Sequence, residues 1–294
     1  MTDIAAAPPI IRQRSPLWFA WQRFLGNKAA VGGGIVLAIL ILMAILAPLI
    51  TRHPPEAQLF LTEALAFPSD QHWFGIDNLG RDFFSRIIYG ARISLSIGFI
   101  AAGFSVLIGI PLGALAGYFG GRTDWFIMRV IELFSVVPPL LAALLLGAMT
   151  RGGYVMIVLI AALFGWVQVC LLVRAQVKAF REKEFVRAAQ ALGASPWYII
   201  RRHLIPNSIS PIIVGFVLAI PLAMMLEASL SFLGVGVPPP TPTWGQMINE
   251  GIDFMFFYWH LAVFPTAALA ITVLATSLFG DGLRDALDPT LKGR

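Results

Sequence analysis

The residue types that most often do chemistry are few in this sequence, and they are not grouped. The single cysteine, Cys170, excludes an internal disulfide and a thiolate-rich zinc or iron–sulfur site. The four histidines are spread along the chain at positions 53, 72, 203 and 260. The chain has no GxxxxGKS/T phosphate loop, HExxH or GxSxG pattern. We therefore expect no catalytic residues, no metal site and no cofactor bound by this chain.

A few ionisable side chains stand inside long apolar stretches, where a charge at mid-bilayer costs about 2.5 to 3.5 kcal/mol on insertion scales. Glu227 has Ser231 one helical turn away, so the two predict a small polar face. They are candidates for a translocation path or gate, and a structural hydrogen bond at a small-residue interface is the alternative. Glu132 is a weaker candidate because pairing with Arg129, three residues away, explains both charges.

Membrane helices are expected to position these side chains. Of the 294 residues, 58% are apolar and only 13% are charged, against about 45–50% and about 25% in ordinary soluble domains. A helix of about 20 apolar residues crosses a bilayer. Six segments meet this requirement: residues 31–50, 93–117, 126–149, 154–173, 209–233 and 261–280. The sequence therefore predicts an all-α polytopic membrane protein with six transmembrane helices.

Two further segments are predicted to be amphipathic helices at the membrane surface. Residues 15–28 mix aromatic and basic side chains, as interfacial helices do. In residues 82–91 the apolar side chains share one helical face, which is expected to rest on the membrane or on the bundle. Asp82, Ser85 and Arg86 share the opposite face, and Asp82 and Arg86 have the i,i+4 spacing of an ion pair.

The distribution of basic residues predicts the orientation in the membrane. With the N-terminus inside, 16 of the 21 Lys and Arg residues lie in cytoplasmic segments, as the positive-inside rule requires. The bases left outside are Arg52, Arg81, Arg86, Arg92 and Arg151. Both termini are therefore expected in the cytoplasm. The formal net charge of +5 reflects this topology, and no nucleic-acid partner is expected.

The segment 174–208 is the largest predicted cytoplasmic insertion, and it has the pattern of two short helices joined by an elbow. Residues 184–192 favour a helix that ends at Gly193. Ser195 suits the N-cap, and Pro196 the first position, of a second helix that ends at Pro206. Spacing alone leaves open a helical hairpin without any partner.

This insertion resembles the EAA loop of permease subunits in ATP-binding-cassette (ABC) importers. The resemblance rests on the AAxxxG run from Ala188 to Gly193 and on the HLIP run that ends at Pro206, thirteen residues after Gly193. Arg187 stands where the family has an acid, and Ile205 stands where leucine is usual. Residues 72–95, 227–247 and 279–289 are similar to peptide-type permeases, which serve dipeptide, oligopeptide, glutathione and nickel importers, and to the second permease of the pair.

The resemblance implies the type I ABC importer permease fold and a function in transport of di- or oligopeptides or a related small solute. It implies a homologous second permease subunit, two ATPase subunits that carry ATP and Mg²⁺, and an extracytoplasmic solute-binding protein, at a bacterial inner membrane. It assigns ATPase coupling to Glu184, Arg187, Ala188, Ala189, Gly193, Ser195, Pro196, His203 and Pro206. An ion-coupled secondary carrier and a non-transporting membrane scaffold are the alternatives.

The expected organisation along the chain follows from these assignments. Residues 1–30 form a cytoplasmic segment with an interfacial helix, and residues 31–50 form the first transmembrane helix. Residues 51–92 are periplasmic. Residues 93–280 form a core of five transmembrane helices that includes the EAA loop 174–208, and residues 281–294 form a cytoplasmic tail.

Overall fold

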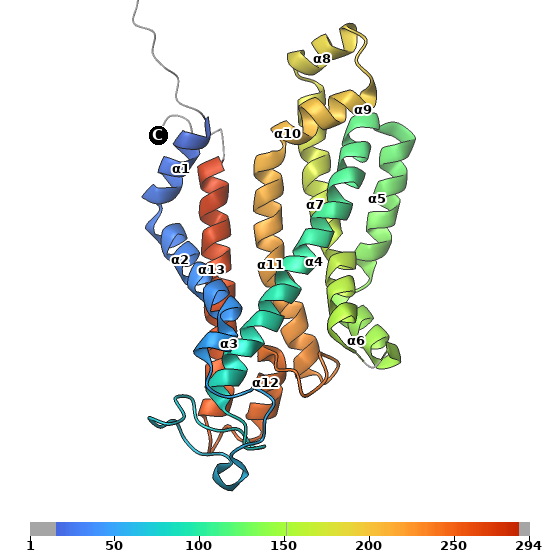
Figure 1. The fold of residues 1–294 in the computed structure, drawn as a ribbon. Helices are drawn as coiled ribbons and strands as arrows, with labels where there is room; N and C mark the ends of the chain where they lie inside the picture. The colour runs from blue at the N-terminus through green and yellow to red at the C-terminus, as the bar shows by residue number, and fades with distance from the viewer. Residues whose placement is uncertain (1–15, 151, 288–294) are drawn as a thin grey trace, which may run out of the picture.

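The computed structural model describes residues 16–150 and 152–287, and the regular elements in these ranges are all helices (Figure 1). Five helices are long and apolar enough to cross a membrane: α2 (Lys28–Ile45), α4 (Phe83–Phe119), α7 (Tyr154–Arg181), α11 (Ile209–Phe232) and α13 (His260–Leu287). A sixth span is present if α5 (Gly121–Val136) and α6 (Pro139–Thr150) count as one broken span. The predicted all-α membrane fold is confirmed.

The predicted third span, 126–149, is bent by 75° between α5 and α6. The bend falls at Pro138 and Pro139, and proline has no N–H to donate to the preceding turn. Proline also disfavours a helical conformation at the residue before it, and Val137 is extended, with ψ of 118°. Two consecutive prolines therefore end α5, and a new helix starts at Pro139.

The predicted amphipathic helix 82–91 is not a separate surface helix. It is the first part of α4, which continues without a break for 37 residues. Asp82 is the N-cap and accepts hydrogen bonds from the backbone N and the hydroxyl of Ser85 (2.9 and 2.7 Å). Arg86 is fully buried and bonds elsewhere, so the expected Asp82–Arg86 pair is wrong. The reason is tertiary, because residues from other segments cover the face that the pattern indicated as polar.

The shorter elements lie at the two ends of the bundle (Figure 1). One end carries α3 (Ala47–Ile50), η1 (Leu61–Glu63) and α12 (Trp244–Ile252). The opposite end carries α1 (Pro16–Gly26), which lies in the segment predicted to form a helix at the membrane surface, and a helical elbow. That elbow consists of α8 (Glu184–Ala191), α9 (Pro196–Ile199), η2 (Ile200–Leu204) and α10 (Ile205–Asn207). We refer to the first end as the α12 end and to the opposite end as the α8 end.

The most extensive helix contact joins α4 to α7. Small residues recur at every fourth position of α4, from Ser105 through Gly109 and Gly113 to Gly117, and such a stripe allows two membrane helices to approach closely. A Cβ atom built on Gly113 would lie 2.5 Å from the carbonyl oxygen of Cys170 on α7. The absence of a side chain at these positions is therefore what permits the observed distance between the helices.

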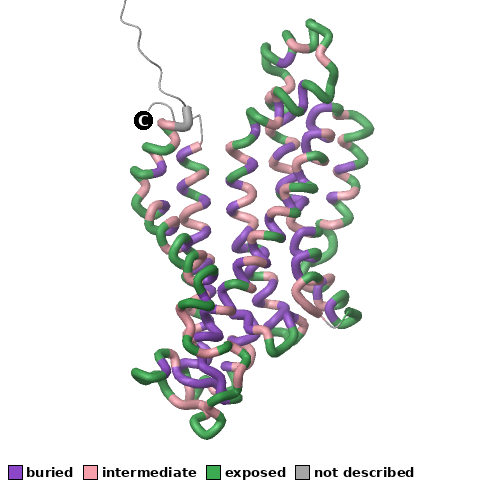
Figure 2. Tube along the Cα trace, viewed as in Figure 1, coloured by how far each residue is buried: buried purple, intermediate pink, exposed green. Residues whose placement is uncertain are grey.

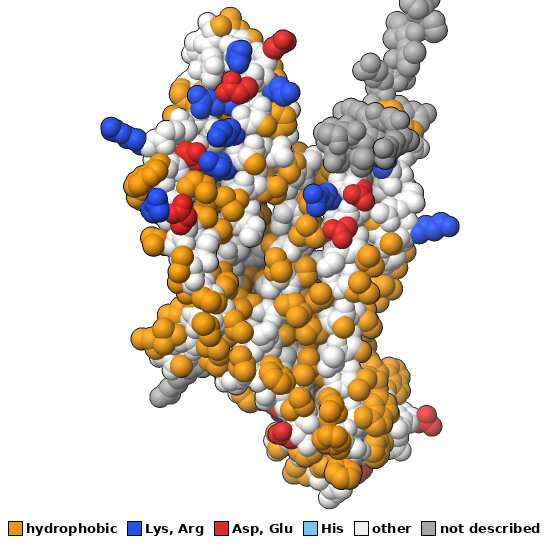
Figure 3. All heavy atoms as spheres, turned by 180° about the vertical axis from the view of Figure 1, so that it is seen from behind, with side chains coloured by type: hydrophobic (Ala, Val, Ile, Leu, Met, Phe, Trp, Pro, Cys, Tyr) orange, Lys and Arg blue, Asp and Glu red, His pale blue; other side chains and the backbone are white. Residues whose placement is uncertain are grey.

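The exposed surface has the character of a membrane protein. Buried residues concentrate along α4, α7 and α11 and at the α12 end, whereas α2 and α5 are largely exposed (Figure 2). Apolar side chains cover the middle of the molecule, and Lys and Arg gather toward the α8 end (Figure 3). The described bases at the α12 end are Arg52, Arg81, Arg86 and Arg92. Arg151 and the last residues of the predicted tail lie outside the described residues.

We predict that Gly113→Ala destabilises the protein, because the new methyl group meets the α7 backbone and forces the helices apart. Overpacking of this kind costs about 1–3 kcal/mol. Gly103→Ala is the matched control, since it lies in the same helix and its Cβ would meet nothing within 4 Å. Thermal unfolding of the purified variants compares them, and equal midpoints would show that close α4–α7 contact is not needed.

Candidate functional site

The predicted helical elbow is present at the α8 end. Gly193 has a φ of 81°, a left-handed conformation that glycine adopts without strain. Its N–H donates to the carbonyl of Gln190, and the next N–H donates to the carbonyl of Ala189, both at 3.0 Å. Ser195 caps α9 by accepting a hydrogen bond from the backbone N of Tyr198 (3.3 Å). The chain therefore leaves α8 and enters α9 at a turn whose bonds are satisfied locally.

The underside of the elbow is anchored in the bundle. Its apolar side chains, Val186, Ile199, Ile200 and Leu204, are buried against the α8-end parts of α4, α7 and α11. Gln190 also donates to the hydroxyl of Tyr118, near the end of α4, across 3.5 Å. The elbow therefore packs directly on three long helices.

The outer face of the elbow carries apolar and basic side chains that are largely exposed. Leu192 is 89% exposed, Trp197 54% and Tyr198 53%. The same elbow carries three exposed arginines, Arg187, Arg201 and Arg202, and the guanidinium of Arg201 lies 5.7 Å from the ring of Trp197. Apolar side chains gathered on a surface and rimmed by charges are typical of a protein–protein contact.

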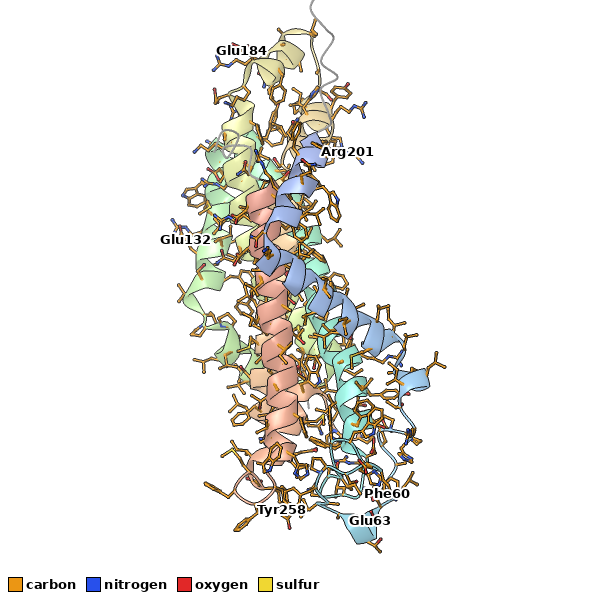
Figure 4. The ribbon with its side chains drawn as sticks, turned by 90° about the vertical axis from the view of Figure 1, so that its left-hand side faces the viewer. Phe60, Glu63, Glu132, Glu184, Arg201 and Tyr258 are labelled. Carbon is orange, nitrogen blue, oxygen red and sulfur yellow. The ribbon has the colours of Figure 1, made fainter. Side chains whose placement is uncertain are left out.

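The structure brings all nine predicted coupling residues onto this elbow. Glu184, Arg187, Ala188, Gly193, Ser195, Pro196 and Pro206 are exposed, while Ala189 and His203 are half-buried. Arg187 pairs with Glu182 (3.1 Å) and not with Glu184. The ring of His203 lies 6.2 Å from the ring of Phe185 and 5.7 Å from that of Tyr198, so it closes the hairpin between the two helices. Figure 4 shows Glu184 and Arg201 together at this end.

The second predicted helix does not stop at Pro206 as a separate unit. It runs through the wider turn of η2 into α10, and Ser208 alone separates it from α11. The elbow is therefore nearly continuous with α11, the helix that carries Glu227.

Glu227 lies in a sealed polar cluster where α4, α11 and α12 meet, toward the α12 end. Its side chain is fully buried and accepts hydrogen bonds from the hydroxyls of Ser231 (2.7 Å) and Ser94 (3.3 Å). The Ser231 hydroxyl accepts one from Thr243 (3.4 Å), and the Ser94 hydroxyl accepts one from the backbone N of Trp244 (3.3 Å). The two predicted partners, Glu227 and Ser231, are thus in contact. The carboxylate holds α12 against two membrane helices in this conformation.

Glu132 does not join that cluster. It lies on the exposed side of α5, well away from the α12 end (Figure 4). It forms an ion pair with Arg129, and both side chains are more than half exposed. The i,i+3 pairing that the sequence suggested is therefore present.

A second buried cluster, which we call the Arg86 network, was not predicted. Arg86 pairs with Glu250 of α12 (3.1 Å) and with Asp77 (3.5 Å), and Arg81 pairs with the same two acids at 3.2 and 2.6 Å. Two positive and two negative charges thus tie the segment before α4 to α12. Asp77 and Arg81 stand close in sequence, but Glu250 is 164 residues from Arg86, and this separation left no local signal.

Comparisons with known proteins identify the family to which the chain belongs. Residues 109–293 match the family described as binding-protein-dependent transport system inner membrane component, and residues 15–68 match the N-terminal TM domain of oligopeptide transport permease C. The glutathione transport system permease protein of Pectobacterium atrosepticum is 40% identical over 98% of this chain and 96% of its own length. The chain belongs to the family of binding-protein-dependent transport inner membrane components.

Other relatives agree with this assignment. The oligopeptide and dipeptide transport system permease proteins of Bacillus subtilis are 41% and 42% identical, over 97% and 93% of this chain and 94% and 85% of theirs. In fold, the chain is similar to the MetNI methionine ABC transporter in an inward-facing conformation, with a TM-score of 0.55 over 69% of this chain and 96% of that chain, at 17% identity.

Membership in this family makes the chain a transport permease subunit of an ABC importer, as the EAA-loop resemblance implied. It also decides between the alternatives left open by the sequence, because a secondary carrier or a scaffold is not what this family contains. The family and the long apolar helices also make the chain a multi-pass protein of the inner membrane.

We predict that Asp77→Asn strongly destabilises the α12 end. The change leaves Arg81 and Arg86 with Glu250 as their single acidic partner, and an uncompensated buried charge costs about 3–5 kcal/mol. Glu63→Gln is the control, because Glu63 is exposed at the same end. Limited proteolysis and the unfolding midpoint report the effect. Unchanged protease resistance in Asp77→Asn would show that the Arg86 network does not hold this end together.

Proposed function

We propose that this chain is one of two homologous permease subunits of an ATP-driven importer that carries di- or oligopeptides or glutathione. The observation that carries the proposal is the elbow, which is buried on its underside and free on its outer face. The transport names of the relatives at about 40% identity, two for peptides and one for glutathione, support the substrate class.

The proposed orientation places the α8 end and both termini in the cytoplasm. The concentration of Lys and Arg toward the α8 end supports it (Figure 3), because basic residues are retained on the cytoplasmic side. The α12 end then faces the extracytoplasmic space, where a solute-binding protein delivers the substrate. Residues 51–82, with η1 and the rings around Phe60, form the outermost part of that end (Figure 4).

Two ATPase subunits are proposed to dock on the elbows of this chain and of its partner permease. The exposed Leu192, Trp197 and Tyr198 supply an apolar contact, and the exposed arginines of the elbow supply positive charge. ATP and Mg²⁺ belong to those subunits. A difference in ATP affinity between the open and closed ATPase pair is what can shift the permease between its two conformations.

The connection between the two ends is α4. Its 37 residues span about 55 Å at 1.5 Å per residue. One end touches the elbow through Tyr118, and the other holds the Glu227 cluster and the Arg86 network. Close packing on α7 stiffens it. We propose that movement of the elbow therefore reaches the contact with α12 as a shift of α4.

Gly193→Glu tests the elbow. No atom lies within 4 Å of a Cβ at this position, so the variant is expected to fold with a strain of about 1–2 kcal/mol from the positive φ. The added acid lies beside the docking face and should uncouple or release the ATPase, with at least a tenfold loss of uptake of a labelled dipeptide or glutathione.

The control for this test is Gly234→Glu, which has nearly the same φ of 79° and equally open space at the α12 end. It adds the same strain and charge at the end opposite the elbow. The Gly234→Glu variant should therefore retain ATPase binding in co-purification. If Gly193→Glu transports normally, the elbow is not the coupling site. If ATPase binding persists but no peptide or glutathione is carried by the wild type, the substrate class is wrong and the coupling stands.

Glu227→Gln tests the proposed role of Glu227 in the path or gate. The carboxylate is sealed in this conformation, so it can meet a solute only when α12 moves away from α4 and α11. We expect normal assembly and uptake reduced by about tenfold, since the amide keeps the shape but not the charge. Unchanged uptake would assign Glu227 to packing alone, and Glu132→Gln, on the exposed face of α5, is the control.

A further inference from the structure

A groove of about 400 Å³ lies between the last turns of α2 and the first half of α4. Five of its lining side chains are apolar, namely Ile41, Ala44, Ile45, Leu95 and Phe99, and the sixth is Arg92. The two helices cross near the α12 end (Figure 1). Neither the Glu227 cluster nor the elbow contributes to this groove.

Arg92 is the exception among the three arginines of residues 81–92. Arg81 and Arg86 are buried and paired with acids, whereas Arg92 is exposed and forms no ion pair with any acid in residues 16–150 and 152–287. Its guanidinium lies 5.8 Å from the ring of Tyr89, a cation–π contact that does not neutralise its charge. The groove therefore has one uncompensated positive charge at its rim.

The depth of the groove corresponds to one leaflet of the bilayer. Arg92 directly precedes an uncharged run, residues 93–117, which is long enough to cross the hydrocarbon core. On the facing helix the uncharged run continues to Ile50, and Arg52 follows it closely. Arg92 is thus at headgroup level, and the apolar walls of the groove lie at the level of the acyl chains.

We propose that this groove binds one phospholipid with a net negative headgroup, of the phosphatidylglycerol type, from the leaflet at the α12 end. The guanidinium of Arg92 hydrogen-bonds the phosphate, for which its planar fork is well suited. One acyl chain lies along Ile41, Ile45 and Phe99. Basic pockets between membrane helices bind anionic lipids in this way.

The charge of the groove selects this occupant. A phosphate diester carries one negative charge and neutralises Arg92, whereas the ammonium group of a zwitterionic lipid brings a second positive charge to the same rim. The bound lipid joins α2 to α4, and this matters because α2 packs mainly on α13 and is otherwise largely exposed.

Native mass spectrometry of the full-length chain, extracted from nanodiscs of phosphatidylcholine containing phosphatidylglycerol, tests the proposal. The wild type should retain one phosphatidylglycerol in preference to phosphatidylcholine. Arg92→Gln should reduce that preference by about tenfold, the size expected for hydrogen bonds to a charged group. Arg52→Gln removes another exposed arginine at the same end, over Trp73 and outside the groove, and should leave the preference within about twofold of wild type.

Ile45→Trp provides a second variant that leaves the charge in place. Ile45 is 63% exposed, so a larger side chain fills the groove without disturbing the core, and lipid retention should fall as it does in Arg92→Gln. Equal retention by the wild type, Arg92→Gln and Ile45→Trp would overturn the proposal. So would a photo-crosslinking residue at Ile45 that, in intact membranes, captures another polypeptide and no lipid, because the groove would then belong to a subunit interface.

Discussion

The close contact between α4 and α7 is the feature on which the rest of the molecule depends. In a bilayer no water competes for the helix surfaces, so association relies on packing and on small residues that allow two backbones to approach. Gly109, Gly113 and Gly117 provide this approach along the half of α4 that leads to the elbow. A helix stiffened in this way can carry a displacement over its full length. A loosely packed helix of the same length would bend.

The two ends of α4 are built from opposite chemistry. At the α8 end the elbow is held by apolar contacts, and a further set of apolar and basic side chains stays free on the outside. At the α12 end the contacts are hydroxyls, carboxylates and guanidinium groups, and most of them are buried. Apolar packing tolerates small sliding movements, whereas a hydrogen-bonded charge cluster has definite made and broken states. This difference suits an α8 end that is displaced by a partner and an α12 end that opens or closes.

Much of the fold was predictable because membrane insertion leaves strong local signals. Long apolar runs marked the spans, and Gly193, Ser195 and Pro196 marked the elbow. The prediction failed at residues 82–91. A polar stripe there indicated solvent, but Arg86 is buried, because residues from before α4 and from α12 cover it.

The sequence by itself therefore determined the class of protein, the position of the elbow and the family. Each of these depends on residues close together in the chain or on composition. The tertiary structure decided which charges are partners, that Glu227 is sealed by Ser94 and Ser231, and that Arg92 stands alone at the rim of a groove. Those outcomes depend on which helices meet and at what depth. Ion pairs and cavities between distant segments form after the helices have packed, so no local pattern encodes them.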